Sequence, residues 1–442
     1  MPTTFRPYAP NQELLLPVSL QEWLPEDHIA YFISEVVEEL DLSPFYTAYE
    51  GDGRRKMPYE PSMMLKVLIY AYATGVFSSR QIARKLEEDV AFRILGAGNF
   101  PRHRTICAFR QRHLNDFKAL FTQVVQVARA TGLVRLGTVS IDGTKVKANA
   151  SKHKAMSYKR LKQEEVRLSE EIKSLCGEAV QVDELEDARF GVDRRGDELP
   201  EELRHRQGRL EKIRAAKARL EAEQREADRA RGRHADDGRK PPSGRGAPFK
   251  RDFGVPEDVA QSNFTDPESR IMNTKDGFQQ CYNGQLVVDD EFQLIVGNEL
   301  TANASDHNML IGLLDGLKET LEDQPERLLA DAGYRKEDDF EALESRDIDA
   351  YICVSREGKG ASDIDAQKYP ATHRMLEKLS TPEGEERYRE RKHLSEAVNG
   401  WIKHVIGFRR FSVRGLSRVS GEWDLVCLAT NLRRMRPLLA MA

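Results

Sequence analysis

Three acidic residues of this 442-residue chain stand in contexts that suit a metal ion. Asp142 follows the apolar run VRLGTVSI, Asp331 lies in LLADAGY, and Glu396 lies in HLSEAVNGWIK. Carboxylate oxygens are hard ligands that suit Mg²⁺ or Mn²⁺. Two such ions, about 3.5–4 Å apart, can activate an attacking oxygen and stabilise a leaving oxygen when a phosphodiester is cleaved.

Each of these acidic residues also has an ordinary explanation. An Asp that precedes a Gly at the end of a strand is usually a turn former, and a Glu within a helix usually lies on a solvated face. Gly143 and Gly333, however, stand close behind the two aspartates and would leave room for a backbone to approach a ligand. The joint placement favours one shared site over three unrelated residues.

Basic residues accompany the acidic ones. Lys145 and Lys147 begin the stretch KVKANASKHK just after the first aspartate, and a carboxylate beside a basic field indicates a metal ion and a phosphate, although a surface hairpin would have a similar sequence. Gly400 and Lys403 follow Glu396 at spacings of four and then three residues, so the three share one helix face. This face fits a metal ligand and a phosphate clamp.

The composition, 40% hydrophobic and 32% charged residues, is typical of a soluble globular protein with highly charged helical segments. The net charge of -4 gives no global signal for nucleic acid, but basic clusters occur at 102–113, 145–154 and 408–418, and binding follows the local field. The longest apolar run, 63–75, is too short to span a bilayer. Because the N-terminus has no signal pattern, we expect a cytoplasmic protein without a membrane partner. The five cysteines are far apart, which argues against a zinc knuckle and a disulfide framework.

The periodicity of apolar residues divides the chain into parts. Residues 20 to about 125 have helical spacing throughout. An arginine-bearing helix at about 105–113 follows a turn through GAGNFP; it is either part of a helix-turn-helix relative or a charged helix that flanks a core, and both remain open. Residues 157–235 predict an antiparallel helical hairpin, a solvated coiled-coil arm. Residues 236–256 are rich in Gly, Pro and basic residues and predict a flexible linker.

After the linker the period changes to two, which indicates strands. We expect a hairpin (278–289 and 291–300), a helix after Ser305 or Asp306, a strand through RLLADAGY, a helix, the strand DAYICV, a long helix from about 385 to 405 and a tail helix. With VRLGTVSI as the first strand, this is the element order of a ribonuclease H-like mixed sheet with the arm inserted after the first strand. The fold class is therefore α/β, preceded by an all-helical domain. In such a sheet the first and fourth strands are neighbours, so Asp142 and Asp331 would emerge side by side at the strand ends.

These residues resemble the DDE transposases of bacterial insertion sequences over nearly the whole chain. The resemblance rests on IDGTKVKANAS around Asp142, on FTDPESRIM, on LADAGY around Asp331 and on a helix that supplies Tyr388, Arg391, Glu396 and Lys403 before GFRRFSVRGL. In one respect the sequence departs from the family pattern. Four residues separate Arg391 from Glu396 where the commonly quoted signature has three, and the position with three-residue spacing is Lys392.

The resemblance implies DNA cleavage and strand transfer by a Mg²⁺-dependent (or Mn²⁺-dependent) enzyme. Asp142, Asp331 and Glu396 would be the catalytic residues and would hold two ions. The partners would be double-stranded DNA, as terminal inverted repeats and as target, and a second copy of the chain in a homodimer, with the arm as a candidate interface. DNA contacts are expected from Lys145, Lys147, Tyr388, Arg391, Lys403, Arg409, Arg410 and Arg414 and, in the N-terminal domain, from Arg104, Arg110 and Arg112.

The expected domains are a helical DNA-binding domain (1–125), a catalytic domain (126–156 and 257–442), the arm (157–235) and the linker (236–256). Two alternatives remain on sequence grounds. A different ribonuclease H-like nuclease would share the three acids but not need an end-binding domain. A non-catalytic DNA-end-binding relative would not need the acids.

Overall fold

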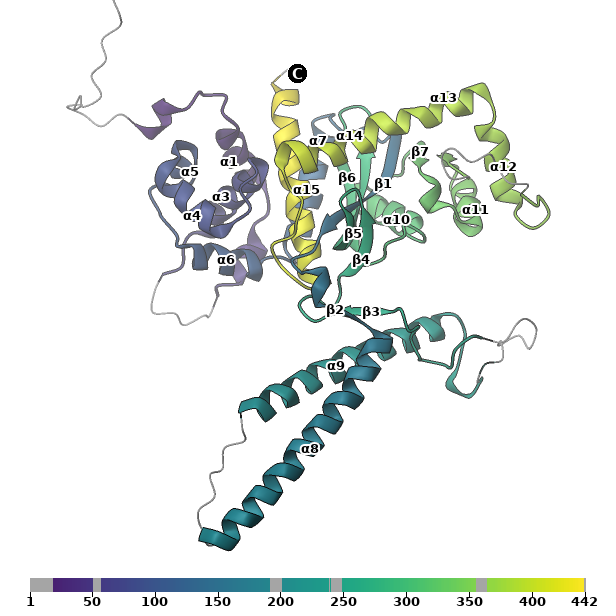
Figure 1. Ribbon diagram of the computed structural model, residues 1–442. Helices are drawn as coiled ribbons and strands as arrows, with labels where there is room; N and C mark the ends of the chain where they lie inside the picture. The colour runs from purple at the N-terminus through teal and green to yellow at the C-terminus, as the bar shows by residue number, and fades with distance from the viewer. Residues whose placement is uncertain are drawn as a thin grey trace, which may run out of the picture.

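The computed structural model describes residues 19–50, 57–190, 201–237, 239, 249–354 and 364–440. A helical N-terminal part, a mixed sheet covered by helices and a long helical arm make up the molecule (Figure 1). No helix in these ranges is long and apolar enough to cross a bilayer.

The N-terminal part is all helical, as the sequence predicts. After a short 3-10 turn, its helices are α1 (Ile29–Glu39), α2 (Ser43–Thr47), α3 (Pro61–Ala73), α4 (Ser79–Glu88), α5 (Val90–Leu95), α6 (His103–Arg112) and α7 (Phe117–Ala130). The stretch from 78 to 95 breaks into two helices at Asp89, whose side chain accepts hydrogen bonds from the N–H groups of Ala91 and Phe92. Such a capping carboxylate satisfies free N–H groups at the start of a helix and therefore fixes the boundary there.

The N-terminal helices share one hydrophobic core with the sheet. Helix α3 is buried along almost its whole length and packs against α15 (Leu416–Leu439), the C-terminal helix. Helix α15 in turn packs on α7 and β6, so it lies between the N-terminal helices and the sheet (Figure 1). Its Trp423 fills the space over Gly284 of the sheet, where an added Cβ would lie 2.8 Å from the indole ring. The apolar faces of these helices hold the two regions together.

The sheet has six strands: β1 (Thr138–Lys147), β4 (Arg270–Thr274), β5 (Gly277–Asp289), β6 (Ile295–Thr301), β7 (Arg327–Ala330) and β8 (Asp349–Ile352). The order is β4-β5-β1-β7-β8, with β6 also paired to β5. Strands β1, β7 and β8 are parallel, whereas β5 runs antiparallel to β1 and β6 antiparallel to β5. This mixed sheet is consistent with the expected ribonuclease H-like fold.

One boundary differs from the sequence prediction at a position that matters. The first strand does not end at Asp142 but continues to Lys147, because residues 142–147 keep their antiparallel pairing with Leu286 to Cys281 of β5. Only the parallel pairing with β7 stops before Asp142, at Ile141 and Ala330. Asp142 therefore lies within a strand that loses one neighbour there, and Lys145 and Lys147 belong to the same strand.

Helices pack on the sheet, and several of them follow its last strand, β8, along the chain. They are α10 (Leu310–Leu321), α11 (Glu337–Ser345), α12 (Pro370–Leu379) and α13 (Pro382–Arg391), followed without a break by a π-turn (Lys392–Glu396), α14 (Ala397–Gly400) and a second π-turn (Trp401–Ile406). The expected helix at 385–405 is thus one continuous helical run. Helix α12 and strand β4 are elements that the sequence interpretation did not include.

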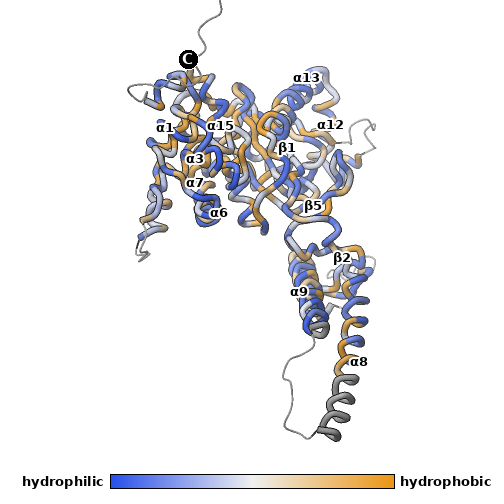
Figure 2. Tube along the Cα trace, turned by 60° about the vertical axis from the view of Figure 1, so that its left-hand side comes forward, coloured by the Kyte–Doolittle hydropathy of each residue, from blue (hydrophilic) through white to orange (hydrophobic). Residues whose placement is uncertain are grey.

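The arm consists of α8 (Tyr158–Phe190) and α9 (Glu201–Ala230), which pack side by side and extend away from the body (Figures 1 and 2). Near its base the helices bury their own small core. There β2 (Ala155–Ser157) pairs with β3 (Gln261–Asn263). Much of the expected linker lies outside the described residues. Of the part that is described, Arg239 pairs with Asp252 at 2.8 Å, and the guanidinium of Arg233 lies 4.0 Å from the Phe249 ring centroid.

Candidate active site

The sheet brings Asp142 and Asp331 to adjacent positions. Ile141 and Ala330 are the last residues paired between the parallel strands β1 and β7, and each is followed directly by one of the aspartates. Asp142 Oδ1 accepts a hydrogen bond from Gly143 N at 3.0 Å. Asp331 Oδ1 accepts one from Gly333 N at 2.8 Å and so begins a short helical turn. The neighbouring carboxylates thus emerge where the parallel pairing ends.

The helical run from Pro382 to Ile406 crosses this point and adds polar groups to it. Ser395 Oγ lies 3.0 Å from Ser140 Oγ of β1, which anchors the run on the strand. Four residues further along, Asn399 Nδ2 donates to Asp142 Oδ2 at 3.0 Å. The Glu396 side chain, on the same run, is 53% exposed, in contrast to the 15% exposed side chain of Asp142.

Arg391 lies between the acidic groups. Its Nη1 is 4.0 Å from Asp142 Oδ1, and its Nη2 is 3.5 Å from Glu396 Oε1. The guanidinium carbon is 5.7 Å from the ring centroid of Tyr388, so the predicted aromatic and cationic residues are also close to one another. Since the Arg391 side chain is only 6% exposed, its charge acts on the carboxylates with little screening by solvent.

The π-turn explains how four residues can separate Arg391 from Glu396. In an α-helix, residues five apart are separated by about 500°, which leaves their side chains about 140° apart around the axis. A π-turn, with hydrogen bonds from i to i+5, absorbs one extra residue and brings such a pair to the same side. Arg391 is accordingly buried beside Glu396, whereas Lys392, the alternative with three-residue spacing, is exposed.

The electrostatics of Asp142 favour a bound cation. Burial, and then repulsion by Asp331, raise the pKa of Asp142 to about 6, against the opposing effects of Arg391 and Asn399. Asp306 adds a smaller repulsive contribution to the pKa of Asp142. Burial also lowers the pKa of Lys403, which Asp142 partly offsets, so the lysine ammonium lies within the field of this cluster. A divalent ion would relieve the repulsion between the carboxylates.

The donor set fits a hard divalent ion, although the site is not a preformed cage. Among the described residues, no group of three or more His, Cys, Asp or Glu side chains is close enough together to hold a metal ion. The available donors are carboxylate oxygens and the Oδ1 atom of Asn399, a side chain 8% exposed, which has no hydrogen-bond partner in the described part of the chain. Oxygen ligands of this kind suit Mg²⁺ and Mn²⁺.

A cavity of about 1040 Å³ opens beside Asp331. Asp331, Tyr388 and Arg391 line one part of it, and residues of the loop between β6 and α10 line another, together with Arg335 and Cys353. The volume lies slightly above the usual range for ligand pockets, about 300–1,000 Å³. Its lining is rich in hydrogen-bonding groups, so it suits a polar ligand.

The basic residues around 145 and around 410 form one surface. Lys147 N donates to Arg409 O at 3.2 Å, and Phe411 N donates to Lys147 O at 2.9 Å, so the segment after the long helix runs beside the end of β1. Arg410 and Arg414 donate to Asn149 Oδ1 and O, each at 2.8 Å.

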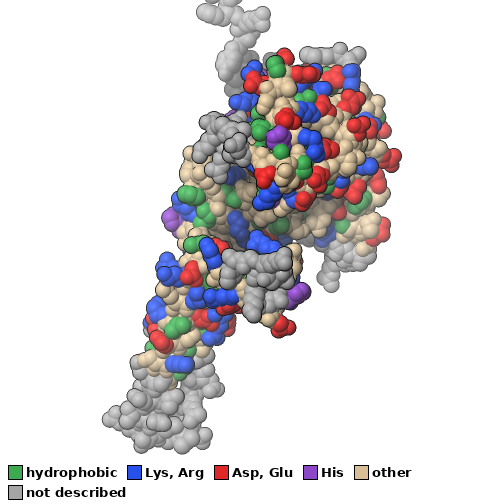
Figure 3. Space-filling model, turned by 90° about the vertical axis from the view of Figure 1, so that its right-hand side faces the viewer, with side chains coloured by type: hydrophobic (Ala, Val, Ile, Leu, Met, Phe, Trp, Pro, Cys, Tyr) green, Lys and Arg blue, Asp and Glu red, His purple; other side chains and the backbone are tan. Residues whose placement is uncertain are grey.

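The two β1 lysines are directed toward the hairpin at the edge of the sheet. Lys147 pairs with Asp276 at 2.8 Å, and Lys145 Nζ donates to Asn273 O at 3.2 Å. Figure 3 shows Lys and Arg side chains gathered where the surface is hollowed between the body and the arm.

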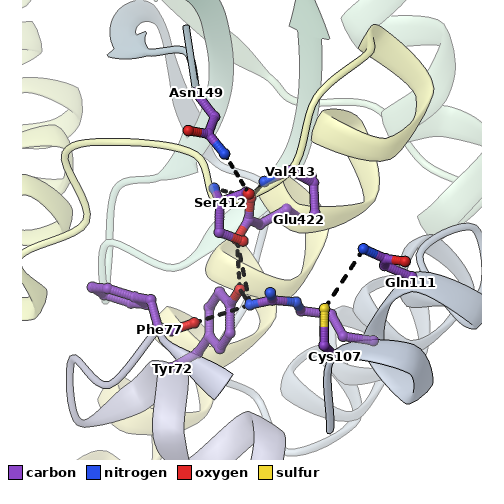
Figure 4. A network of polar contacts seen from close by, with 9 residues as sticks. Tyr72, Phe77, Cys107, Gln111, Asn149, Ser412, Val413 and Glu422 are labelled. Atoms are coloured by element: carbon purple, nitrogen blue, oxygen red, sulfur yellow. Dashed lines mark hydrogen bonds and ion pairs between the residues drawn. The ribbon is translucent and has the colours of Figure 1, made fainter. Parts of the chain in front are cut away.

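The N-terminal arginines differ from one another. Arg104 and Arg112 are exposed, and Arg112 Nη1 donates to Ala48 O at 3.1 Å. Arg110, predicted as a DNA contact, is instead inside the protein with 4% exposure; it donates to Tyr72 Oη at 3.0 Å and to Phe77 O at 2.9 Å. Its Nη1 also lies 3.9 Å from Glu422 Oε1, which accepts a hydrogen bond from Tyr72 Oη (Figure 4). Helical spacing alone does not say which face of α6 packs on α3, and Arg110 lies on that face.

Two polar residues of this region were not predicted from the sequence. Asn399, rather than the neighbouring Gly400, contacts Asp142; its position three residues after Glu396 is the signal that could have identified it. Asp306, which the sequence suggested only as a helix cap, has its carboxylate over Gly143 and Gly333. A single Asp in a loop carries no local pattern that would reveal this placement.

Comparison with known families gives two matches. Residues 18–112 match the family described as Transposase domain (DUF772), and residues 253–432 match the family described as Transposase DDE domain. The second match includes Asp331 and the helical run with Glu396, and together the two matches cover more than half of the chain. No curated protein and no solved structure matches the chain.

Proposed function

Because the chain belongs to the DDE transposases of insertion sequences, we propose that it binds the ends of its element and carries out metal-dependent strand cleavage and strand transfer. The observation that carries this proposal is the meeting of Asp142 and Asp331 at the end of the β1–β7 pairing, with Arg391 between Asp142 and Glu396. Asp142 and Asp331 come from distant parts of the chain, and the Arg391 guanidinium links Asp142 to Glu396.

In this proposal Asp142, Asp331 and Glu396 hold two Mg²⁺ or Mn²⁺ ions. Ions bound there supply Lewis-acid stabilisation of the attacking and leaving oxygens of the phosphodiester. Arg391, whose guanidinium lies 4.0 Å from the Asp142 carboxylate and 3.5 Å from that of Glu396, would donate to a phosphate oxygen of the bound strand. Lys403 is a second cation for that phosphate, and Tyr388 borders the cavity in which the strand near the scissile bond would lie.

The DNA path follows the basic surface. Arg409, Arg410 and Arg414 are exposed beside the end of β1, so they are suited to contacts with the phosphate backbone that do not depend on sequence. We assign residues 1–125 to end recognition and residues 126–156 and 257–442 to catalysis, although both are packed on one core. Affinity for DNA should fall steeply with salt, because each neutralised phosphate releases counterions. The place of action would be the bacterial nucleoid.

Joining two ends requires two active sites, so the working form would be a homodimer. The arm, α8 and α9, extends away from the body (Figure 1) and would supply the contact with the second subunit. Removing residues 157–235 should leave a folded body that binds single ends but does not pair them, as measured by the mass of the DNA complex. Paired complexes of normal mass would exclude the arm as the interface.

A footprinting and strand-transfer experiment separates this function from its alternatives. The substrate is DNA that carries the short inverted repeats flanking the reading frame. A transposase protects the repeat, nicks at its end in Mg²⁺ and joins the released 3′ hydroxyl to a second DNA. A different ribonuclease H-like nuclease would cut without a footprint on the repeat, and a non-catalytic relative would give the footprint without cleavage.

A further inference from the structure

The carboxylate of Asp306 lies against Gly143 and Gly333, the glycines just after the two aspartates that the proposed function uses. It lies in the loop between β6 and α10, far in sequence from both. A Cβ added at Gly143 would collide with Asp306 Oδ1, and one added at Gly333 would lie 3.0 Å from Asp306 Oδ2. Both glycines stand just after a predicted metal ligand, so the group that approaches these glycines is the carboxylate of Asp306.

Buried amides hold this carboxylate in place. Asp306 Oδ1 accepts from Asn283 Nδ2 at 2.7 Å and from Gln285 Nε2 at 2.6 Å, and these side chains on β5 are 1% and 0% exposed. Gln285 lies opposite Gly143 in the β1–β5 register. Its Oε1 accepts a hydrogen bond from the hydroxyl of Tyr334, in the turn that Asp331 begins. One hydrogen-bonded chain, from Asp306 through Gln285 to Tyr334, thus joins β5, the strand paired with β1 beside Asp142, to the turn that Asp331 begins.

A further feature of the cluster points to a bound cation. Asn283 Oδ1 is buried and has no hydrogen-bond partner in the part of the chain that the structure describes, so this amide is an unused oxygen donor next to Asp306. Asp306 also places a third negative charge near Asp142 and Asp331, and a cation would relieve the repulsion among them.

We propose that Asp306 is a positioning residue for the divalent-ion site, which fixes the separation of Asp142 and Asp331 and raises the affinity of the pair for the ion. It acts through the Gln285–Tyr334 chain and through its charge, not by touching the DNA. The proposal rests on the proposed function, because it concerns the ion site defined there. Removing an outer-shell partner of a metal ligand typically lowers metal affinity about 10- to 100-fold.

Mn²⁺ binding to the full chain without DNA tests this role, with the free ion measured by electron paramagnetic resonance. Asp306→Asn keeps the size of the side chain and an acceptor for both amides but removes the charge; its Mn²⁺ affinity should fall about 10-fold. Asp306→Ala removes the charge and the hydrogen bonds and should lose more. Asp338→Asn, at a side chain 80% exposed on α11, is the matched control and should bind Mn²⁺ as the wild type does.

A second measurement separates positioning from general damage to the fold. In Asp306→Asn, binding of end DNA in EDTA should stay unchanged, because it does not depend on the ion, and the midpoint of thermal unfolding should not fall, because the variant keeps the acceptor for both amides and removes a repulsive charge. Mn²⁺ affinity within twofold of wild type in Asp306→Asn would overturn the proposal, and this result stands even if Asp306→Ala does not fold. If Asp142→Asn also binds Mn²⁺ normally, the proposed ion site itself is wrong; if only Asp142→Asn loses the ion, the positioning role alone is wrong.

Discussion

The buried carboxylate of Glu422 connects the N-terminal helices to the C-terminal part of the chain, and its replacement should be costly. It is 0% exposed and accepts from Tyr72 Oη at 2.6 Å and from Ser412 N at 2.8 Å (Figure 4). It also lies 3.9 Å from Arg110 Nη1, whose side chain is 5% exposed. Glu422→Gln keeps the shape but leaves the guanidinium buried without its countercharge.

The expected magnitude follows from this burial. Removing one partner of a buried ion pair costs about 3–5 kcal/mol, because the other charge remains desolvated. We therefore expect the free energy of unfolding, measured by urea denaturation, to fall by about 3–5 kcal/mol in Glu422→Gln. Glu319→Gln, at an exposed position of α10, is the control and should change it by no more than about 0.5 kcal/mol.

A double-mutant cycle shows whether the loss comes from this pair. If the two charges act together, the double mutant Arg110→Met/Glu422→Gln should lose less free energy of unfolding than the sum of the losses in the two single mutants. Each single mutant leaves one buried charge without its partner, whereas the double mutant leaves none. Arg110→Met should also leave the dependence of DNA affinity on salt unchanged, whereas loss of a true phosphate contact lowers that slope by about 1. A loss below about 1 kcal/mol in Glu422→Gln, or an additive double mutant, would refute this reasoning.

Two further predictions concern the π-turn and a buried acid. Deleting Lys392 restores the three-residue spacing between Arg391 and Glu396, so an α-helical turn should keep both side chains on one face and DNA cleavage should persist. Inserting an alanine after Lys392 should instead reduce the cleavage rate about 100-fold. Equal cleavage rates for the two variants would contradict the role given to the π-turn. Burial raises the pKa of Asp424 to about 6, so above that pH its charge lowers the free energy of unfolding. This cost disappears as the pH falls toward 3.8, the pKa of the group in the unfolded chain. Asp424→Asn should accordingly raise the free energy of unfolding by up to about 3 kcal/mol at pH 8 and leave it nearly unchanged at pH 3.5, in urea titrations at both pH values; a gain that is the same at both pH values would count against a buried charge.

The sequence was sufficient for most strands of the sheet, because strand patterning is local, but not for β4. Alternating apolar residues gave the hairpin and the order of strands, and that order placed Asp142 beside Asp331. It did not give the length of β1, because the six residues from Asp142 to Lys147 remain a strand only through pairing with β5, more than a hundred residues later. Long-range pairing of this kind leaves no trace in a short window.

The parts of the site that the sequence missed depend on packing between distant segments. The π-turn that brings Arg391 to Glu396 is invisible to a search for α-helical spacing. The burial of Arg110 is set by Tyr72 and Glu422, on two other helices. Asp306 reaches the glycines behind the aspartates only because the β6–α10 loop folds back over β5.

The most direct test of the central claim compares Asp142→Asn with the wild-type protein on DNA that carries one end of the element, in Mg²⁺. Asparagine keeps the size of the side chain and one oxygen but removes the charge that would hold the ion. We predict that the variant binds the end DNA with wild-type affinity and gives no cleavage. Cleavage by Asp142→Asn at the wild-type rate would contradict the metal-site assignment.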